Sequence, residues 1–361
     1  MSYKSVVPRT QLATYGPGVE VNFDLLHDGE AILPGSLWLT GSLAITTTAQ
    51  PGTSEHYIDN YAGVGAFLEN VITRCDAYQE VITNYGRLCK HNAMVQYSPD
   101  QLCAGISHTG EMRAPHLRMM PVIVDSTTAT PYSFTHKPLV ALNSMSAPLD
   151  SSKSGRIQFS FKLPSIQKVA FGAQAAEVTG YNFSNLQLHY KTTLAPGTGP
   201  VIVNIVQDTQ KLIQSSRTTI MNTFPDQVNK VLVSFAQTET ETDNTLNSLV
   251  CQFPPIQKVS WVYNDVSNGL VAYDIQTPEE LVLSGLGVMK ALGVGIDLRD
   301  ALGLSYQDPQ HSKTDKFALG LSLGANMDFS RTGLGCTIEL SPGVTDQYYA
   351  YFYAYGSKQI A

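Results

Sequence analysis

The sequence predicts an all-β protein with short helical insertions, built as two tandem halves of β-sandwich or barrel type. Three observations lead to this prediction. Apolar and polar residues alternate with a period of two in many short segments. Patterns of helical spacing are confined to one stretch in the middle of each half, so strands do not alternate with helices as in an α/β protein. A linker at residues 193–200, rich in glycine and proline, separates two halves of similar composition.

The first half begins with a polar stretch, residues 1–13, which we interpret as an N-terminal arm. Strands are expected where Val19, Val21 and Phe23 alternate with polar residues, and again over residues 37–45. From 59 to 87 the apolar residues approach helical spacing, which predicts a helical insertion near 59–87.

The rest of the first half is less regular. Residues 97–155 are rich in proline and predict loops, with brief strands at 122–124 and 139–142. Clear alternation returns at 157–163 and 186–190. We therefore expect a first domain over residues 14–192.

The second half, residues 201–361, repeats this order. Strands are expected at its start and around Val231–Phe235 and Val259–Tyr263. Thr277 can cap a helix, Pro278 suits its first position and Glu280 completes a capping box, so a helix is predicted near 278–292. The clearest alternation follows, in residues 317–329, 336–340 and 348–355.

The last of these segments places four tyrosines on one face, Tyr349, Tyr351, Tyr353 and Tyr355. Aromatic residues on both faces favour a central strand, packed against another sheet or subunit. Trp38 and Trp261 are further candidates for packing or interface positions. The alternative is a sugar-binding platform, which requires the tyrosine face to be exposed.

A short internal repeat has one copy in each half. Residues 163–171 (Leu-Pro-Ser-Ile-Gln-Lys-Val-Ala-Phe) and 253–261 (Phe-Pro-Pro-Ile-Gln-Lys-Val-Ser-Trp) share five residues in the same order. Both copies predict a strand entered through a proline. The copies lie too close together to mark equivalent points of two duplicated halves. We interpret them as the same strand entry used at different corners.

Composition and motifs point away from catalysis. Only 15% of the residues are charged, compared with roughly 25% in a typical soluble domain, and a surface poor in charge favours assembly into a larger object. The net charge of −7 includes no basic block, so direct nucleic-acid binding is not expected. The sequence shows no secretory signal, membrane span, disulfide framework or phosphate loop.

No enzymatic constellation, cofactor or metal site is predicted. The tightest group of potential ligands is His108, Glu111 and His116 in a loop, and nothing fixes its geometry. Paired carboxylates in a β-sandwich cleft, as in a glycosidase, remain an open alternative because the sequence selects no pair.

Four segments carry a resemblance to a known family. They are Val21–Leu43, Arg156–Pro164 with Asn185–Tyr190, Phe253–Tyr263, and Thr332–Leu340 with the tyrosine-rich strand. Together they resemble the opening strands, closing strands, proline-led strand and ending of double jelly-roll major capsid proteins. This is the lineage of tailless icosahedral viruses that includes adenovirus hexon, tectivirus and giant-virus capsid proteins. Residues 97–155 depart from the family's pattern.

The resemblance implies two tandem eight-stranded antiparallel jelly rolls and a structural role without catalysis. The chain would form pseudo-hexagonal homotrimers that tile an icosahedral shell, with penton and minor capsid proteins as further partners. It would be made in the host cytoplasm and reside in the virion, with a membrane-containing bacteriophage as the expected source. In such viruses the arm often faces an internal bilayer, which makes Lys4 and Arg9 candidate membrane-facing residues.

The alternative interpretation is a two-domain β-sandwich carbohydrate-binding protein, a glycosidase or a viral receptor-binding spike.

Overall fold

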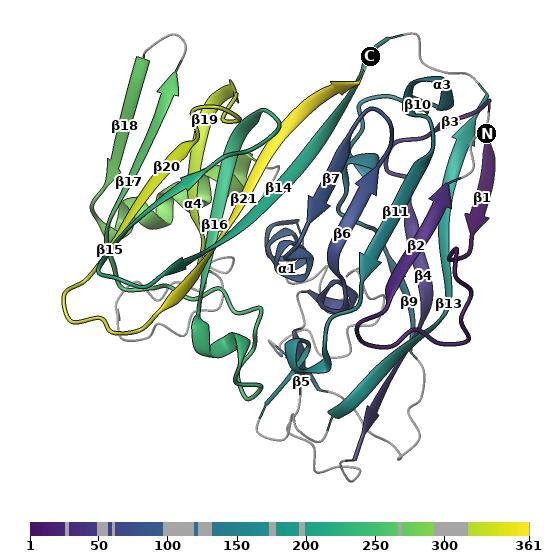
Figure 1. The fold of residues 1–361 in the computed structure, drawn as a ribbon, viewed down its shortest axis with the longest axis horizontal. Coiled ribbons are helices and arrows are strands. Elements are labelled where there is room, and N and C mark those ends of the chain that lie inside the picture. Colours follow the sequence, from purple (N-terminus) through teal and green to yellow (C-terminus); the bar gives the residue numbers. More distant parts are fainter. Residues whose placement is uncertain are drawn as a thin grey trace.

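The computed structural model describes residues 1–25, 29–48, 57–59, 62–96, 119–121, 132–172, 178–194, 199–265, 269–291 and 317–360. Two β-rich halves lie side by side, with the N-terminal half on the right of Figure 1 and the C-terminal half on the left.

In the described residues of the C-terminal half, eight strands form two four-stranded antiparallel sheets, ordered β14-β21-β16-β19 and β15-β20-β17-β18. Its elements are β14 (Val201–Ile213), β15 (Arg217–Asn222), β16 (Val228–Gln237), the 3-10 helix η5 (Thr238–Glu241), β17 (Ile256–Asp265), β18 (Gly269–Ile275), α4 (Pro278–Ala291), β19 (Leu319–Met327), β20 (Leu334–Leu340) and β21 (Tyr348–Ile360). Alternate residues of these strands point between the sheets, where Trp261 meets Phe352 edge to face.

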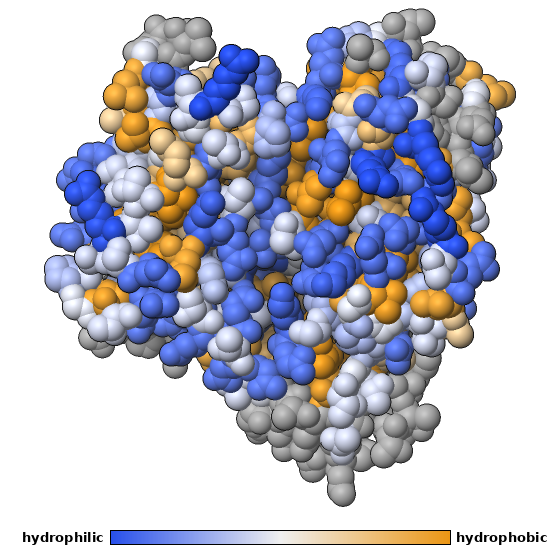
Figure 2. Space-filling view, in the orientation of Figure 1, coloured by the Kyte–Doolittle hydropathy of each residue, from blue (hydrophilic) through white to orange (hydrophobic). Residues whose placement is uncertain are grey.

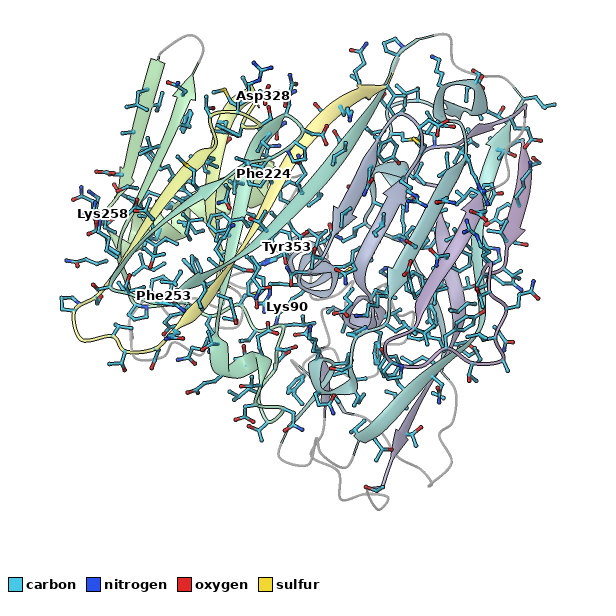
Figure 3. The ribbon with its side chains drawn as sticks, viewed as in Figure 1. Lys90, Phe224, Phe253, Lys258, Asp328 and Tyr353 are labelled. Carbon is cyan, nitrogen blue, oxygen red and sulfur yellow. The ribbon has the colours of Figure 1, made fainter. Side chains whose placement is uncertain are left out.

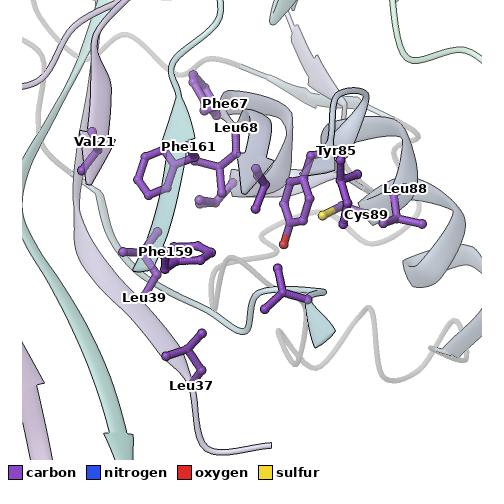
Figure 4. Packing of buried hydrophobic residues seen from close by; sticks show 14 of the residues in the cluster. Val21, Leu37, Leu39, Phe67, Leu68, Tyr85, Leu88, Cys89, Phe159 and Phe161 are labelled. Atoms are coloured by element: carbon purple, nitrogen blue, oxygen red, sulfur yellow. The ribbon is translucent and has the colours of Figure 1, made fainter. Parts of the chain in front are cut away.

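The N-terminal half has the same framework with additions. Its elements are β1 (Ser2–Val6), β2 (Glu20–Leu25), β3 (Ala31–Ile32), β4 (Trp38–Thr47), β5 (Tyr57–Asp59), η1 (Gly63–Phe67), β6 (Glu69–Arg74), β7 (Gln79–Ile82), α1 (Tyr85–Gln96), β8 (Met119–Pro121), β9 (Tyr132–His136), η2 (Ala141–Asn143), β10 (Leu149–Asp150), α3 (Ser151–Ser154), β11 (Ile157–Lys162), η3 (Ile166–Lys168), β12 (Ala170–Phe171) and β13 (Val178–Thr193). Two sheets face each other, β1-β13-β4-β9 and β2-β11-β6-β7. Phe23 packs against Phe159 and Phe161 between them. Figure 4 shows Phe159 and Phe161 in this core.

The two halves are equivalent strand by strand. The orders β1-β13-β4-β9 and β14-β21-β16-β19 correspond, as do β2-β11-β6-β7 and β15-β20-β17-β18. In each half a helix follows the same strand, α1 after β7 and α4 after β18. The prediction of two tandem antiparallel β-domains is therefore confirmed. The strands β3 and β10 and the small sheet β12-β5-β8 occur in the first half without a counterpart among the described elements of the second.

The helix predicted near 278–292 is confirmed as α4. Its capping box is formed, because Thr277 Oγ1 accepts a hydrogen bond from Glu280 N and Glu280 Oε2 accepts one from Thr277 N, both at 3.3 Å. Within the described residues, no helix has the length and apolar character needed to cross a membrane.

The predicted helical insertion near 59–87 was wrong over most of its length. β6 and β7 occupy Glu69–Arg74 and Gln79–Ile82 as an antiparallel pair, and α1 begins only at Tyr85. The helix-like spacing of Ala62, Ala66 and Phe67 belongs to the single 3-10 turn η1. Contact with β11 overrides the local pattern, since β6 completes a sheet that buries Val71.

Other differences have similar causes. The first repeat copy forms a 3-10 turn, η3, followed by the two-residue strand β12, whereas the second copy forms the strand β17. Residues 139–142 enter the 3-10 helix η2 instead of a strand. The segment 122–124 lies outside the described residues.

The N-terminal segment, predicted as an arm, forms part of a sheet. Ser2–Val6 pairs antiparallel with residues 188–192 of β13. It takes the sheet position that β14 holds in the second half, so the polar side chains predicted for a free arm belong to an edge strand.

Candidate functional site: the seam between the two halves

The two halves meet along one extended contact, which we call the seam. It joins the outer face of the β14-β21-β16-β19 sheet and residues 241–251 to α1, β7 and residues 138–146 of the first half. Apolar side chains of β14, β16 and β21 belong to the first half's hydrophobic core, and these include Val201, Val203, Ile205, Leu232, Ala236, Tyr351 and Tyr353. The seam is therefore a continuation of a protein core rather than a surface contact.

The tyrosine face of β21 lies in this seam. Tyr351 is 1% exposed and Tyr353 is fully buried, while Tyr349 and Tyr355 are partly buried beside them. Tyr353 Oη donates to Asn84 O at 3.1 Å, and Tyr351 Oη donates to Glu241 Oε1 at 2.5 Å. Each buried ring thus has a partner for its hydroxyl, as burial of tyrosine requires.

The first half pairs with the beginning of the free edge of β14. Met145 forms an antiparallel bridge with Val203. Ser146 N donates to Ile202 O at 2.8 Å, and Ile202 N donates to Ser146 Oγ at 2.9 Å. An exposed sheet edge is a template for unwanted pairing, and here the same chain covers it.

Two side-chain carboxylates form further hydrogen bonds between the halves along β14. Glu80 of β7 accepts Val206 N at 2.9 Å with one oxygen and Ala141 N at 2.7 Å with the other. Asp208 of β14 accepts the backbone N–H of Asn84 at 2.8 Å, and that of Thr83 at the same distance, immediately before α1. Asp208 thus caps, from the second half, a helix that belongs to the first.

Burial changes the acidity of both carboxyls. Loss of solvent raises the pKa of Glu80 to about 7, although the two backbone N–H donors oppose that shift. Loss of solvent also raises the pKa of Asp208, against the hydrogen bonds from Thr83 and Asn84. Glu80 therefore titrates near neutral pH inside the seam.

The helix α1 brings cationic side chains into the seam. Arg87 is 2% exposed, and its guanidinium donates to Ser248 O at 2.5 Å and to Val250 O. The same guanidinium lies 4.0 Å from the centre of the Tyr351 ring. A buried arginine without such partners would be strongly destabilising, so the second half is required for α1 to be buried.

Lys90 and His91 of α1 are buried as well. Lys90 Nζ lies 2.7 Å from Asp59 Oδ2, and the same oxygen accepts Asn247 Nδ2 of the second half at 2.7 Å. His91 packs edge to face against Tyr353, and burial lowers the pKa of His91 to about 3. Figure 3 shows Lys90 and Tyr353 in the region between the two halves.

The other residues singled out from the sequence lie elsewhere. Trp261 is fully buried in the core of the second half, away from the seam. Trp38 is 36% exposed on the outer face of β4, with Lys137 Nζ 5.6 Å from its ring centre. Lys4 pairs with Glu30 at 2.6 Å, and Arg9 pairs with Asp24 through two hydrogen bonds. The membrane-facing role of Lys4 and Arg9 stays a prediction.

Sequence reasoning missed the polar residues of the seam. Arg87, Lys90 and His91 have the i, i+3, i+4 spacing of one helix face in a chain poor in charge, and that pattern could have marked them. The predicted helical insertion ended at residue 87, before Lys90 and His91. Glu80 carried no signal, because both its partners lie more than 60 residues away.

The described part of the chain contains no group of three His, Cys, Asp or Glu residues arranged to hold a metal ion. His108, Glu111 and His116 lie outside the described residues. Seam contacts such as those of Arg87 and Asp208 position backbone and rings rather than a substrate. The arrangement therefore acts mechanically, by fixing one β-domain against the other.

The fold is similar to solved structures of viral capsid proteins. A chain of the quasi-atomic PBCV-1 virus capsid has a TM-score of 0.59 and 10% identity, with 99% of this chain and 94% of that chain covered. The cryo-EM structure of the Sputnik virophage gives 0.58 and 10%, covering 99% and 86%. The mavirus major capsid protein gives 0.56 and 9%, covering 98% and 86%.

The sequence matches no family model and no curated protein. At these identities the structural matches show the fold, which is the double jelly roll predicted from the sequence. Each half is therefore one roll.

Proposed function

We propose that this chain is the major capsid protein of an icosahedral virus, a structural subunit without catalysis. One observation carries the proposal. Both rolls together match capsid proteins in alignments that cover 98–99% of this chain. A likeness over a single roll would fit many unrelated β-proteins, whereas a full-length match to a two-roll subunit fits a shell protein.

The seam supports this function physically. A shell subunit must hold its two rolls at a fixed angle, since every neighbour contact depends on that angle. The paired edge of β14, the cap from Asp208 and the buried Arg87 hold the rolls together by hydrogen bonds as well as by apolar packing. Two equivalent rolls per chain give six similar wedges in a ring of three chains, and a homotrimer is the expected assembly.

The equivalence of the rolls also indicates where neighbouring copies meet. Within the chain, the outer β14-β21-β16-β19 face packs on α1 and β7. The equivalent surfaces are the outer β1-β13-β4-β9 face and the α4–β18 region. The first of these exposes Tyr3 and Trp38, and the second exposes Leu270 and Leu283. In the proposed trimer, each copy applies one surface to the other surface of its neighbour.

The surface outside these two regions is mainly polar, which agrees with contacts between copies that are confined to limited areas. Figure 2 shows hydrophobic residues in several small groups on this face rather than in one continuous patch. Penton and minor capsid proteins, and an internal membrane, are further expected partners that belong to this proposal. A bacteriophage source is expected from the sequence resemblance, and the fold does not indicate a host.

The carbohydrate-binding alternative loses its main support. It requires an exposed tyrosine ladder, whereas Tyr351 and Tyr353 are buried within the chain itself. A sugar could reach them only if the rolls separated.

Native mass spectrometry of the purified chain tests the proposal. We expect a particle of three chains of 39.3 kDa each, with a pseudo-hexagonal outline in electron micrographs. A stable monomer at micromolar concentration would contradict the assembly. Leu283→Asp should lower the trimer's association constant at least about tenfold, because it puts a charge into the proposed contact.

Met221→Asp is the matched control for that variant. Met221 is 61% exposed and Leu283 is 63% exposed, but Met221 lies on β15 outside both proposed surfaces. If the wild type is a trimer and Leu283→Asp leaves it unchanged, the assignment of the contact fails while the capsid proposal stands.

A further inference from the structure

Three side chains meet at the seam in an arrangement that has chemical consequences. Asp59 Oδ2 contacts Lys90 Nζ at 2.7 Å and accepts Asn247 Nδ2 at 2.7 Å. One carboxylate oxygen therefore bridges an amine of the first roll and an amide of the second. Because both nitrogens contact the same atom, they lie within about twice 2.7 Å of each other.

The remaining atoms of this cluster are also held. Asp59 Oδ1 accepts Ala62 N at 2.9 Å, which fixes the carboxylate. Asn247 Oδ1 accepts Leu249 N at 2.9 Å, which fixes the amide and polarises its carbonyl. The amide thus has a hydrogen-bond donor on its oxygen and a carboxylate on its nitrogen, while an amine lies beside that carboxylate.

These are the parts that an acyl transfer from an amide to an amine needs. A lysine amine is the nucleophile, and a carboxylate can remove its proton. A backbone N–H stabilises the negative charge that develops on the carbonyl oxygen. The same carboxylic acid can return the proton to the departing nitrogen.

We propose that Lys90 and Asn247 join in an isopeptide bond that ties the two rolls together. Asp59 takes a proton from the Lys90 ammonium, and the neutral Nζ attacks Asn247 Cγ. The tetrahedral intermediate holds its charge on Oδ1, beside Leu249 N–H. Asp59 then protonates Nδ2, the Cγ–Nδ2 bond breaks and ammonia leaves. The attacking Nζ gives its remaining extra proton to Asp59, which passes it to the departing ammonia, so that the products are a neutral amide and an ammonium ion. One C–N bond replaces another, so the step needs no oxidant, metal or cofactor.

The reacting groups are shielded from water. Lys90 and Asp59 are 0% and 1% exposed as side chains, and their contact at 2.7 Å lets a proton pass directly from Nζ to the carboxylate. Asn247 is only partly buried, which leaves the ammonia a path to solvent.

The bond would join α1, in the middle of the seam, to the loop that carries Ser248 and Val250. That loop also accepts the hydrogen bonds of Arg87. A covalent link at this point closes a long loop of chain and restricts the unfolded state, as a disulfide does in an oxidising compartment. It needs only folding to bring its parts together.

The intact mass of the purified full-length chain tests the proposal. The expected mass is lower than the sequence mass by one molecule of ammonia. After trypsin, residues 88–113 should be linked to residues 231–258, since acylated Lys90 is not cleaved. A folded chain whose mass equals the sequence mass would overturn the proposal.

Three variants separate this bond from other chemistry. Lys90→Arg keeps a cation beside Asp59 but removes the nucleophile, so the ammonia loss should disappear. Its persistence would show a cyclic imide of Asn247, formed with the next residue, and would overturn the proposal. Asp59→Asn should also abolish the loss, whereas the exposed control Lys168→Arg should retain it.

Discussion

At the residue scale, the seam depends on polar side chains that are buried only because the other roll supplies their partners. Glu80 accepts Val206 N, Arg87 donates to Ser248 O, and Asp208 accepts Asn84 N, in each case across the boundary between the rolls. Leaving one such group unpaired costs several kcal/mol, about as much as removing a large apolar side chain. These contacts therefore specify one relative position of the rolls.

Glu80 should make the stability of the chain depend on pH. Its pKa in the folded chain, about 7, lies above the ordinary 4.5. Its contribution is therefore fully present below pH 4.5 and is lost as pH rises through about 7. The shift corresponds to about 3 kcal/mol.

Glu80→Gln removes the titrating group and should remove that dependence, although its amide nitrogen cannot accept the second backbone N–H, so the variant loses one hydrogen bond at every pH. We expect the wild type to lose about 3 kcal/mol of stability relative to the variant between pH 4.5 and pH 8. Urea unfolding of both proteins over this range measures the difference. The comparison cancels the opposite effect of His91, whose depressed pKa lowers stability below pH 6.5. If the unfolding free energies of the two proteins changed with pH in parallel, Glu80 would not be the titrating group.

At the element scale, one short sequence shows how context selects a conformation. In both repeat copies the isoleucine and the valine three residues later are buried, namely Ile166 and Val169, and Ile256 and Val259. A spacing of three does not fit the period of a flat strand. The first copy buries both residues by a 3-10 turn, and the second does so by a β-bulge between Ile256 and Lys258.

The helix α4 supplies a test of packing at this scale. A Cβ at Gly285 would lie 1.9 Å from Ala318 O, whereas a Cβ at Gly287 would meet nothing within 4 Å. Gly285→Ala should therefore force α4 away from the start of β19 and cost about 2 kcal/mol or more. Thermal unfolding monitored by circular dichroism measures the effect.

Gly287→Ala is the control on the same helix. Alanine is the better helix former by about 1 kcal/mol, so this variant should be neutral or slightly more stable. Equal destabilisation by the two variants would mean that α4 does not pack closely against β19.

At the scale of the whole molecule, the seam couples two hydrophobic cores. The core of the second roll lies between its own sheets, while the core of the first extends across the seam to Tyr351 and Tyr353. The chain holds two tryptophans, Trp38 in the first roll and Trp261 in the second. Each roll therefore has its own fluorescent reporter, and the two transitions should coincide in the wild type.

Tyr353→Ala should uncouple the rolls. It removes a fully buried ring and the hydrogen bond to Asn84 O, at a cost of about 3–5 kcal/mol. We expect the transitions reported by Trp38 and Trp261 to separate in urea, with Trp38→Phe used to isolate the second signal.

Tyr273→Ala serves as the control, because Tyr273 is 48% exposed on the edge strand β18. It should cost less than about 1 kcal/mol and leave the transitions coincident. Coincident transitions in Tyr353→Ala would show that the tyrosine face does not couple the rolls.

Sequence alone was sufficient for the features that depend on local periodicity. The alternation in residues 348–355 predicted a central strand, and β21 lies between β14 and β16. The capping box at Thr277 predicted α4, and the linker with similar patterns on either side predicted two β-domains. The first two signals each lie within one element, and the third is the sum of many such local patterns, because burial of one strand face or one helix end leaves its mark on neighbouring residues.

Only the tertiary structure decided how the two rolls are joined. It placed residues 1–6 in a sheet, replaced the expected helix at 69–82 by β6 and β7, and assembled the seam from Glu80, Arg87 and their distant partners. A buried charge is tolerated when a hydrogen-bonding partner lies next to it. For Arg87, that partner is more than 100 residues away in the sequence. No local period records such a pairing, so its physical cause becomes visible only when the chain is folded.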